Sequence, residues 1–201
     1  MESLAAFAIA YLLGSIPFGL LLTRLAGTQD LRSVGSGNIG ATNVLRTGHK
    51  GLAAATLVLD AGKGFLAVWV NSRGYTGPAD YVHLAMGTSS ALFVVLGHCF
   101  PIWLRFKGGK GVATTLGVAL GLAWPVGLAY ALVWLAMLGL TRISSLAGMG
   151  AAVTAPLAAW LVGQSHLVPV LAAIAVVVLI LHRENIARLR AGIEPKVGSK
   201  S

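Results

Sequence analysis

The stretch VATTLGVALGLAWPVGLAYALVWLAMLGL, residues 112–140, decides the fold because it carries no charged side chain. A transmembrane helix needs about 20 mostly apolar residues. This stretch is too long for one such helix and short for two. Its Trp124-Pro125 pair marks a break, because a residue before proline is disfavoured in a helix. We therefore predict two short, consecutive membrane crossings here.

Apolar stretches on either side of this segment predict five further crossings. They run over about Ser3–Leu25, Gly51–Val70, Tyr81–Trp103, Leu146–Val162 and His166–Leu181. The total is seven, or five if residues 112–140 are misread. The sequence thus predicts an all-α, polytopic integral membrane bundle of about seven transmembrane helices, with residues 1–201 forming a single domain.

The composition agrees with a membrane protein and excludes several other classes. Of the 201 residues, 56% are hydrophobic and 10% are charged, against roughly 45–50% and about 25% in an average soluble domain. A single cysteine excludes a disulfide scaffold, and the dominance of apolar residues excludes disorder. A net charge of +9 would indicate nucleic-acid binding in a soluble protein. In a membrane protein, the excess of Lys and Arg first reports which loops remain in the cytosol.

The basic residues predict the orientation of the bundle. Glu2 precedes the first apolar stretch and Arg24 follows it, which favours a retained helix with its N-terminus outside over a signal peptide. With this start, all Lys and Arg but two fall in four segments on one side of the membrane. The exceptions are Lys63, on the inner half of the second helix, and Arg73, on the outside. These segments are residues 24–50, 105–110, 142–145 and 182–201. By the positive-inside rule this side, with the C-terminus, is cytoplasmic, and single cations also serve as lipid-headgroup contacts.

The first inner segment is dense in glycine and in small hydrogen-bonding side chains. Glycine lets backbone N–H groups converge on an anion, hydroxyl and amide side chains add donors, and Arg adds a fork suited to phosphate. The segment predicts a phosphate cradle, with a flexible polar linker as the alternative. The residues concerned are Gly35, Ser36, Gly37, Asn38, Gly40, Thr42, Asn43 and Arg46. Its glycines also satisfy G-x-G-x-x-G, but no Rossmann domain is predicted because the pattern follows a membrane helix rather than a strand.

The second inner segment, KGGKG over residues 107–111, leads directly into a predicted helix. Glycines, two cations and a helix N-terminus make a good anion site, with a tight turn carrying topology-setting lysines as the alternative. A Walker A loop is excluded because Gly111, not Ser or Thr, follows Lys110. The predicted anion-binding residues are Lys107, Gly108, Gly109, Lys110, Gly111 and Thr114.

Two further polar groups near or within the helices each have two interpretations. Arg142, Ser144 and Ser145 begin the sixth helix from the inner side, where they cap the helix or complete an anion site. Asp60 and Lys63, one turn apart in the second helix, are expected to form an ion pair that is structural or catalytic.

The segment after the last helix places His182 and Asn185 on one helical face and spaces Glu184 and Arg188 for an i,i+4 pair. His182 is either an interfacial or a catalytic histidine. The other histidines are scattered without ligand spacing, and Cys99 lies within a helix as a small apolar residue. We therefore predict no metal site.

Three separated motifs resemble one known family. They are GSGNIGATN with Arg46, over residues 35–46; GHCFP and FKGGKGVAT, over residues 97–114; and HRENIARLRAGIE, over residues 182–194. The resemblance covers essentially the whole chain and is to the bacterial membrane acyl-phosphate:glycerol-3-phosphate acyltransferases.

This resemblance implies an activity and its setting. A fatty acyl group passes from acyl phosphate to glycerol 3-phosphate, giving 1-acyl-sn-glycerol 3-phosphate (lysophosphatidic acid) and inorganic phosphate, the first acylation of phospholipid synthesis. Neither acyl-CoA nor acyl carrier protein is the donor, and no cofactor, metal or nucleic acid is implied. The active site faces the cytoplasm of the bacterial inner membrane, in contact with membrane lipid, and an acyl-phosphate-producing enzyme is the functional neighbour.

The resemblance also implies roles for residues of each motif. Ser36 and Arg46 are essential, and residues 107–111 bind the phosphate of glycerol 3-phosphate. His182 and Asn185 are important for activity. A Glu that is important for the structure is Glu184 or Glu194.

The chemistry of the implied reaction sets modest demands on the site. Acyl phosphate already has a good leaving group, so the site must chiefly align the glycerol hydroxyl and stabilise negative charge on the carbonyl oxygen. The proton acceptor is His182 or a substrate phosphate oxygen, and a nucleophilic Ser36 would accumulate an acyl-enzyme without acceptor. An organophosphate transporter is the competing class, because Asp60 and Lys63 also fit a translocation path. Outer loops poor in cations argue against it, and a membrane scaffold would leave the glycine-rich loops without purpose.

Overall fold

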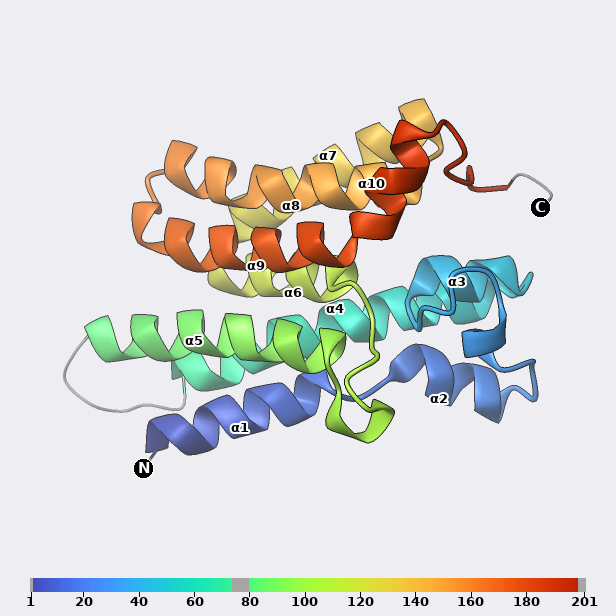
Figure 1. The fold of residues 1–201 in the computed structure, drawn as a ribbon. Coiled ribbons are helices and arrows are strands. Elements are labelled where there is room, and N and C mark those ends of the chain that lie inside the picture. Colours follow the sequence, from blue (N-terminus) through green and yellow to red (C-terminus); the bar gives the residue numbers. More distant parts are fainter. Residues whose placement is uncertain (1, 74–79, 199–201) are drawn as a thin grey trace.

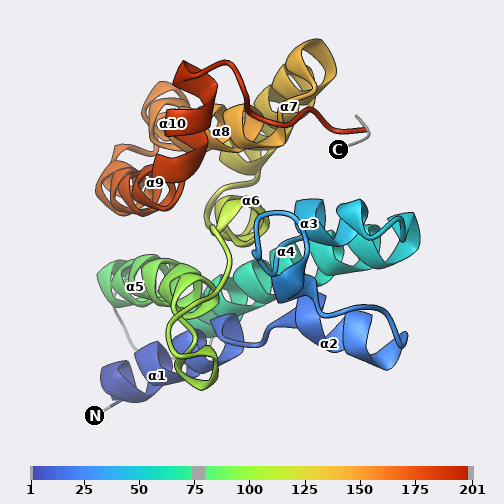
Figure 2. The same cartoon turned by 45° about the vertical axis from the view of Figure 1, so that its right-hand side comes forward.

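The structure, a computed structural model, describes residues 2–73 and 80–198, and it is helical without strands over these residues. Figure 1 shows α1, α4 and α5 in one group, α7, α8 and α9 in another, and α6 between them, and Figure 2 shows the same arrangement after rotation. The predicted all-α bundle is confirmed. The helices are α1 (Glu2–Gly14), α2 (Phe18–Leu25), α3 (Ala41–Arg46), α4 (Lys50–Arg73), α5 (Asp80–Cys99), α6 (Val112–Leu122), α7 (Trp124–Thr141), α8 (Ser144–Leu161), α9 (Val168–Leu181) and α10 (Arg183–Arg190), with short 3-10 turns at Leu31–Ser33, Ile102–Leu104 and Ser165–Leu167.

A helix lies in each of the seven predicted crossings, but their lengths differ. Within the described residues, five segments have the length and apolar composition of a membrane span, and α9 with α10, bent by 59°, makes a sixth if the pair is one span. The five are Leu4–Leu25, Lys50–Asn71, Gly87–Leu104, Trp124–Thr141 and Ser144–Leu161. The 11 residues of α6 rise about 16 Å, against a hydrocarbon core of about 30 Å. The sequence estimate of seven counts α6 as a crossing, whereas length supports five to six.

The predicted break before Pro125 is confirmed. Helix α6 ends at Leu122, Ala123 is extended with φ −157° and ψ 110°, and α7 begins at Trp124 with Pro125 in its first turn. Proline is tolerated there because a first-turn N–H has no partner within the helix. Two short helices therefore replace one long apolar run.

The first predicted crossing is broken, a correction to the single helix expected over residues 3–25. Helix α1 ends at Gly14 and α2 begins at Phe18. The carbonyl groups freed at the break are bound from other helices: Trp103 Nε1 donates to Ser15 O at 2.7 Å, and Lys63 Nζ donates to Ile16 O at 2.8 Å. Backbone polar groups at membrane depth need such partners, so the break is built into the packing.

Glycines bring two pairs of helices into backbone contact. A Cβ built on Gly64 of α4 would overlap the carbonyl of Thr114, and one on Gly117 of α6 would overlap the carbonyl of Ala61. Gly14 of α1 faces the backbone of Val94 on α5 in the same way. Such small residues let membrane helices approach closely. Helix α6 is therefore held tightly on α4, which fixes where its N-terminus lies.

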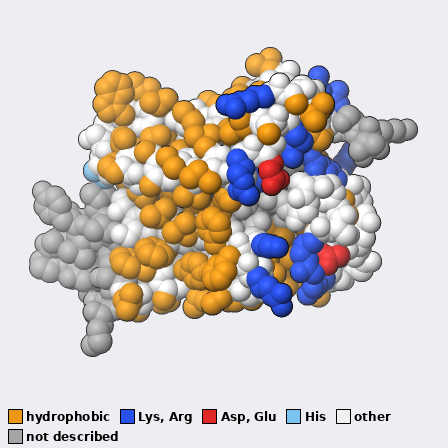
Figure 3. Space-filling model, viewed as in Figure 1, with side chains coloured by type: hydrophobic (Ala, Val, Ile, Leu, Met, Phe, Trp, Pro, Cys, Tyr) orange, Lys and Arg blue, Asp and Glu red, His pale blue; other side chains and the backbone are white. Residues whose placement is uncertain are grey.

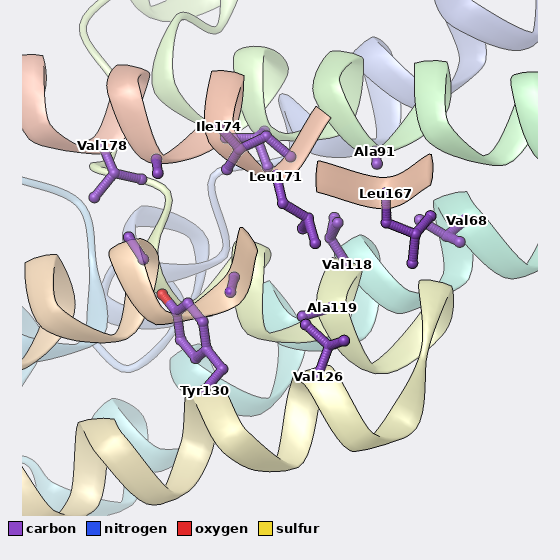
Figure 4. Close-up of a cluster of buried hydrophobic side chains, with 14 of the residues drawn as sticks. Val68, Ala91, Val118, Ala119, Val126, Tyr130, Leu167, Leu171, Ile174 and Val178 are labelled. Atoms are coloured by element: carbon purple, nitrogen blue, oxygen red, sulfur yellow. The ribbon is translucent and has the colours of Figure 1, made fainter. Parts of the chain in front are cut away.

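A buried apolar cluster joins α6 to α7, α8 and α9 (Figure 4). Val118 and Val126 are fully buried in it, and the hydroxyl of Tyr130 donates to the carbonyl of Val112 at 2.9 Å. The polar tip of Tyr130 is thus bonded to the first residue of α6. The core therefore supports the N-terminal end of α6 from the side opposite α4.

The surface separates apolar and basic side chains. Figure 3 shows a broad hydrophobic region, with Lys and Arg gathered toward the end of the bundle where α3 and α10 lie. This agrees with the predicted gathering of basic segments at one end. Within that prediction, the side chain of Arg73 and residues 199–201 lie outside the described part of the chain.

Candidate active site

A cavity of about 120 Å³ lies at the basic end of the bundle, where all three predicted motifs meet. Twelve of the predicted site residues line it: Ser36, Asn38, Gly40, Thr42, Asn43, Arg46, Lys110, Gly111, Ser144, Ser145, His182 and Asn185. They come from segments up to about 150 residues apart, so the bundle rather than the local sequence brings them together.

Asn43 organises the first predicted loop. Its side chain is buried; Nδ2 donates to the carbonyls of Leu31 at 2.8 Å, Val34 at 3.0 Å and Asn38 at 2.8 Å, and Oδ1 accepts from the N–H of Ser36 at 3.3 Å. The Asn43 side chain therefore holds the backbone of residues 31–38 in a closed loop beside the cavity. Ser36 is held by its backbone in this loop.

Two glycines of this loop have left-handed backbone conformations. Gly35 has φ 54° and Gly37 has φ 66°, a region that side chains with a Cβ rarely adopt. A Cβ on Gly35 would lie 2.7 Å from Asn43 Oδ1 and from a guanidinium nitrogen of Arg46. Gly35 therefore lets the backbone pass close to Arg46, while Gly37 serves the turn and does not line the cavity.

The second predicted loop is tied to the end of α5. The N–H groups of Gly108 and Gly109 donate to the carbonyls of Cys99 at 3.0 Å and His98 at 2.9 Å. Both amides are thus used within the protein, and Gly108, Gly109 and the exposed Lys107 do not line the cavity. Its lining from this loop is Lys110 and Gly111, and the latter has φ 84°. Thr114, also predicted for this site, is buried and does not line the cavity, and its backbone carbonyl faces Gly64 of α4.

The N-termini of two helices of more than two turns open onto the cavity. Gly111, Val112 and Ala113 at the start of α6 line it, as do Ser144 and Ser145 at the start of α8. Unpaired N–H groups and the helix dipole make such ends favourable for anions. Two of them beside Arg46 and Lys110 give the cavity the character of an anion site.

Arg142 serves the C-terminal segment instead of the cavity. Its guanidinium donates to the carbonyl of Val197 at 2.9 Å, and the N–H of Val197 donates to the carbonyl of Arg142 at 2.7 Å. Of the three residues predicted to cap α8 or bind an anion there, Ser144 and Ser145 line the cavity and Arg142 does not.

Glu194 joins three side chains around the cavity. Its Oε1 accepts from Ser145 and Asn185, both at 2.6 Å, and its Oε2 accepts from Arg188 at 2.6 Å. Burial by itself would raise the pKa of the Glu194 carboxyl, but these hydrogen bonds and the Arg188 charge outweigh it and hold the pKa below its usual range. Of the two candidates for the structural glutamate, Glu194 is the one in this network.

Glu184 is exposed and lies 4.0 Å from Arg183, so the structure gives Arg188 a different partner from the predicted Glu184. The i,i+4 spacing alone favoured Glu184. The segment that brings Glu194 back onto α10 is irregular and gives no periodic signal.

Lys110 and His182 are held in defined orientations. The ammonium of Lys110 donates to Asn185 Oδ1, and burial, with Arg188 nearby, holds the pKa of Lys110 below its ordinary value. His182 Nδ1 lies 2.7 Å from the carbonyl of Val178. Because a carbonyl only accepts, Nδ1 carries the proton, which leaves Nε2 of the neutral ring as an acceptor.

The inner wall of the cavity contains Asp60, for which the sequence left a structural and a catalytic role open, and His98, to which it assigned no role. Asp60 and His98 line it, and the predicted ion pair is confirmed, with Lys63 Nζ 2.7 Å from Asp60 Oδ1. His98 Nδ1 lies 3.6 Å from the same oxygen. The position of His98 in the GHCFP motif was the one sequence signal for it.

An apolar wall and a wider hollow complete the surroundings. Leu57, Val112 and Trp134 add apolar lining to the cavity. A hollow of about 870 Å³ adjoins it and shares Ser36, Thr42, Arg46 and Ser144 with it; Gly35, Lys50, Arg188 and Lys196 are among its other lining residues. Among the residues that the structure describes, no three His, Cys, Asp or Glu side chains are grouped to hold a metal ion.

The fold and the site define an integral membrane protein that has a cavity lined by cations and helix N-termini at the basic end of an apolar helical bundle. The chain belongs to the glycerol-3-phosphate acyltransferase family, whose family model matches residues 4–192. It is 61% identical over 198 residues to the glycerol-3-phosphate acyltransferase of Erythrobacter litoralis, covering 98% of this chain and 96% of that protein. It is 62% identical over 200 residues to that of Novosphingobium aromaticivorans, covering 100% and 98%.

Two crystal structures of PlsY (YgiH), an integral membrane glycerol 3-phosphate acyltransferase, share this fold. The glycerol 3-phosphate form matches with a TM-score of 0.90 at 38% identity, and the lysophosphatidic acid form with 0.89 at 36%. Each match covers 98% of this chain and 96% of the other. The predicted family and the membrane bundle are confirmed by these similarities.

Proposed function

We propose that this protein transfers a fatty acyl group from acyl phosphate to glycerol 3-phosphate, forming 1-acyl-sn-glycerol 3-phosphate and inorganic phosphate. Membership of the glycerol-3-phosphate acyltransferase family supports the acceptor and the enzyme class, as do the ligands named for the two PlsY structures. The observation that carries the proposal is the cavity in which Arg46, Lys110 and two helix N-termini meet beside an apolar wall. Such a site suits a phosphorylated head group attached to, or reacting with, a hydrocarbon chain.

The proposed reaction is an acyl transfer from a mixed anhydride. The glycerol oxygen forms the new ester bond to the acyl carbon, the bond between that carbon and the phosphate oxygen breaks, and phosphate leaves. The hydroxyl proton goes to His182 Nε2 or to a phosphate oxygen of the substrate. Because phosphate is a good leaving group, alignment and stabilisation of the developing oxyanion are the main tasks of the protein.

The roles that we assign follow the geometry of the cavity. Arg46, Lys110 and the first turns of α6 and α8 hold phosphate oxygens, and Ser36 donates to a substrate oxygen. Asn185, fixed by Glu194, orients the Lys110 ammonium. No metal or cofactor is assigned a role, and acyl phosphate is the donor rather than acyl-CoA or acyl carrier protein.

The cellular setting is part of the same proposal. The protein is a multi-pass membrane protein of one domain, and we assign the basic end, with the cavity and the C-terminus, to the cytoplasm and the N-terminus to the outside of the bacterial inner membrane. Gathering of Lys and Arg at the end shown in Figure 3 supports this orientation. A neighbouring enzyme that makes acyl phosphate supplies the donor, and no nucleic acid is involved.

The proposal is tested with purified protein in detergent, palmitoyl phosphate and glycerol 3-phosphate, measuring phosphate release and lysophosphatidic acid together. We expect equal amounts of both products, and none when palmitoyl-CoA replaces palmitoyl phosphate. Arg46→Ala should abolish turnover, whereas Lys107→Ala, which removes an exposed cation away from the cavity, should retain it. Lysophosphatidic acid formed from glycerol 3-phosphate with palmitoyl-CoA as the sole acyl donor would overturn the assignment of the donor.

A further inference from the structure

His98 lies at the end of α5, between the Asp60–Lys63 ion pair of α4 and the glycine-rich loop over residues 107–111. Its side chain is 4% exposed. On one side its Nδ1 lies 3.6 Å from Asp60 Oδ1, which in turn lies 2.7 Å from Lys63 Nζ. On the other side its ring reaches the loop. A buried ionisable residue in this position connects two parts of the cavity wall.

The loop rests on His98 through both backbone and ring. The carbonyl of His98 accepts from the N–H of Gly109 at 2.9 Å. The ring fills the space that a side chain at position 109 would need, because a Cβ there would overlap Nε2 and lie 2.6 Å from Cε1 and 2.8 Å from Cδ2. Residue 109 is thus a glycine because the His98 ring occupies that space.

The residues that follow Gly109 are the ones that face the cavity. Lys110 and Gly111 line it, Lys110 binds Asn185, and Val112 begins α6. A shift of Gly109 away from α5 would therefore move the Lys110 ammonium and the first turn of α6 together. His98 does not need to contact a substrate to affect how a phosphate binds.

We propose that His98 is a positioning residue for the phosphate of glycerol 3-phosphate, acting through Gly109 on Lys110. Asp60, which is paired with Lys63, lies beside the ring on the α4 side. The ring supports Gly109, and Gly109 sets the place of Lys110 and of the N-terminus of α6. This inference rests on the proposed function and adds to it a residue of the inner cavity wall that determines acceptor binding through the loop it supports.

The first test is His98→Ala with steady-state kinetics for both substrates. We expect KM for glycerol 3-phosphate to rise about tenfold while KM for palmitoyl phosphate stays within about twofold. Ser90→Ala is the matched control, since Ser90 is also buried on α5 and its hydroxyl has no hydrogen-bond partner among the described residues. A merely structural role would lower the active fraction, and so kcat, with both KM values unchanged, and that result would overturn the proposal.

The second test uses the space that the ring vacates. Gly109→Ala alone should raise KM for glycerol 3-phosphate, and in the His98→Ala background the added methyl group should fit, so that its effect becomes smaller. Gly108→Ala is the control, because a Cβ at Gly108 meets Pro101 and the backbone carbonyls of His98 and Cys99, which the His98→Ala change leaves in place. Equal effects of Gly109→Ala in both backgrounds, or equal relief of Gly108→Ala, would refute the coupling.

Failure of the proposed function is distinguishable from failure of this inference. Wild-type protein without acyl-phosphate-dependent turnover would count against the function alone. The same variants are therefore also compared by equilibrium dialysis with labelled glycerol 3-phosphate, which requires no reaction. Weaker binding in His98→Ala, with the Gly109→Ala effect reduced in that background, supports the positioning role, and unchanged binding contradicts it.

Discussion

Arg142 and Val197 bind each other through two hydrogen bonds of opposite direction, 2.7 Å from the N–H of Val197 and 2.9 Å from the guanidinium of Arg142. Arg142 lies at the left-handed turn between α7 and α8, with φ 61°. Together with Glu194, which binds Ser145 and Asn185, this pair fastens the segment over residues 191–198 at two points beside the cavity. Residues 191–198 are therefore held next to the cavity, which Glu194 lines.

Glu194→Gln should weaken the hydrogen bonds that hold residues 191–198 beside the cavity, and the loss of stability should depend on pH. The folded-state pKa of Glu194 is below the ordinary value of about 4.3, so its carboxylate contributes stability that is present above that value and is lost as pH falls through the folded pKa. We expect the apparent Tm of the wild type to exceed that of Glu194→Gln at pH 7, and the difference to shrink below about pH 4.

The control for this experiment is Glu184→Gln, because the Glu184 side chain is 71% exposed. Its Tm should follow the wild type across the pH range. A wild-type advantage over Glu194→Gln that is the same at pH 3 as at pH 7 would contradict the assigned charge.

Gly35→Ala should displace the Arg46 side chain and so reduce activity by more than backbone strain alone would. The backbone of residue 35 would have to keep φ 54° with a side chain present. The new Cβ would lie 2.7 Å from Asn43 Oδ1 and from a guanidinium nitrogen of Arg46. Gly27→Ala is the matched control, because Gly27 has a similar φ of 65° and no atom of the described residues beyond its chain neighbours lies within 4 Å of a Cβ built there. Both variants carry backbone strain of about 1 kcal/mol, but only Gly35→Ala should reduce kcat/KM by about tenfold or more. Similar kinetics for the two would argue that position 35 has no link to Arg46.

The buried ion pair of α4 should show strong coupling. Removing one partner of such a pair costs about 3–5 kcal/mol, because the other charge is left buried and unpaired. Lys63→Met should therefore lower the apparent Tm more than the double variant Asp60→Asn/Lys63→Met, in which neither charge remains. Thermal melting in detergent measures these two variants and Asp60→Asn. A lowering in the double variant equal to the sum of the two single lowerings would mean that the two residues act independently.

The orientation of the bundle can be determined by cysteine labelling, because the native Cys99 is buried. Ser165 is exposed in the turn between α8 and α9, at the ends of these helices away from α10 in Figure 1, and is changed to Cys in one variant. The exposed Lys107 is changed to Cys in another. A membrane-impermeant maleimide applied to intact cells should label Ser165→Cys, and Lys107→Cys only after permeabilisation. The reverse pattern would invert the proposed topology.

Local sequence chemistry was sufficient for some helix boundaries and insufficient for others. Trp124-Pro125 marks the end of one apolar helix and the start of the next, because proline acts on its immediate neighbours. Pro17 was equally visible, yet the break there was not predicted. The break at Pro17 is stabilised by side chains far away in the sequence. Trp103 donates to the carbonyl of Ser15 and Lys63 to that of Ile16, and both reach these carbonyls only in the folded bundle.

The same distinction applies to the site. Residue types suited to phosphate identified Ser36, Arg46 and Lys110, and the family resemblance identified His182 and Asn185. The fold brings all five to one cavity. The glycines at 108 and 109 suggested a cradle by composition. Their amides instead bind the end of α5, and no sequence pattern reports which carbonyl groups an amide will meet.

The apolar side of the cavity, with Leu57 and Trp134, has a consequence for the energetics of lipid synthesis. Moving a hydrocarbon chain into water costs about 0.8 kcal/mol for each methylene group. In the proposed reaction the hydrocarbon chain can stay in the membrane throughout, while the small, highly soluble acceptor comes from water and the released phosphate returns to it. Chain length then adds no solvation barrier to turnover, and the finished lipid is released directly into the leaflet that it enlarges.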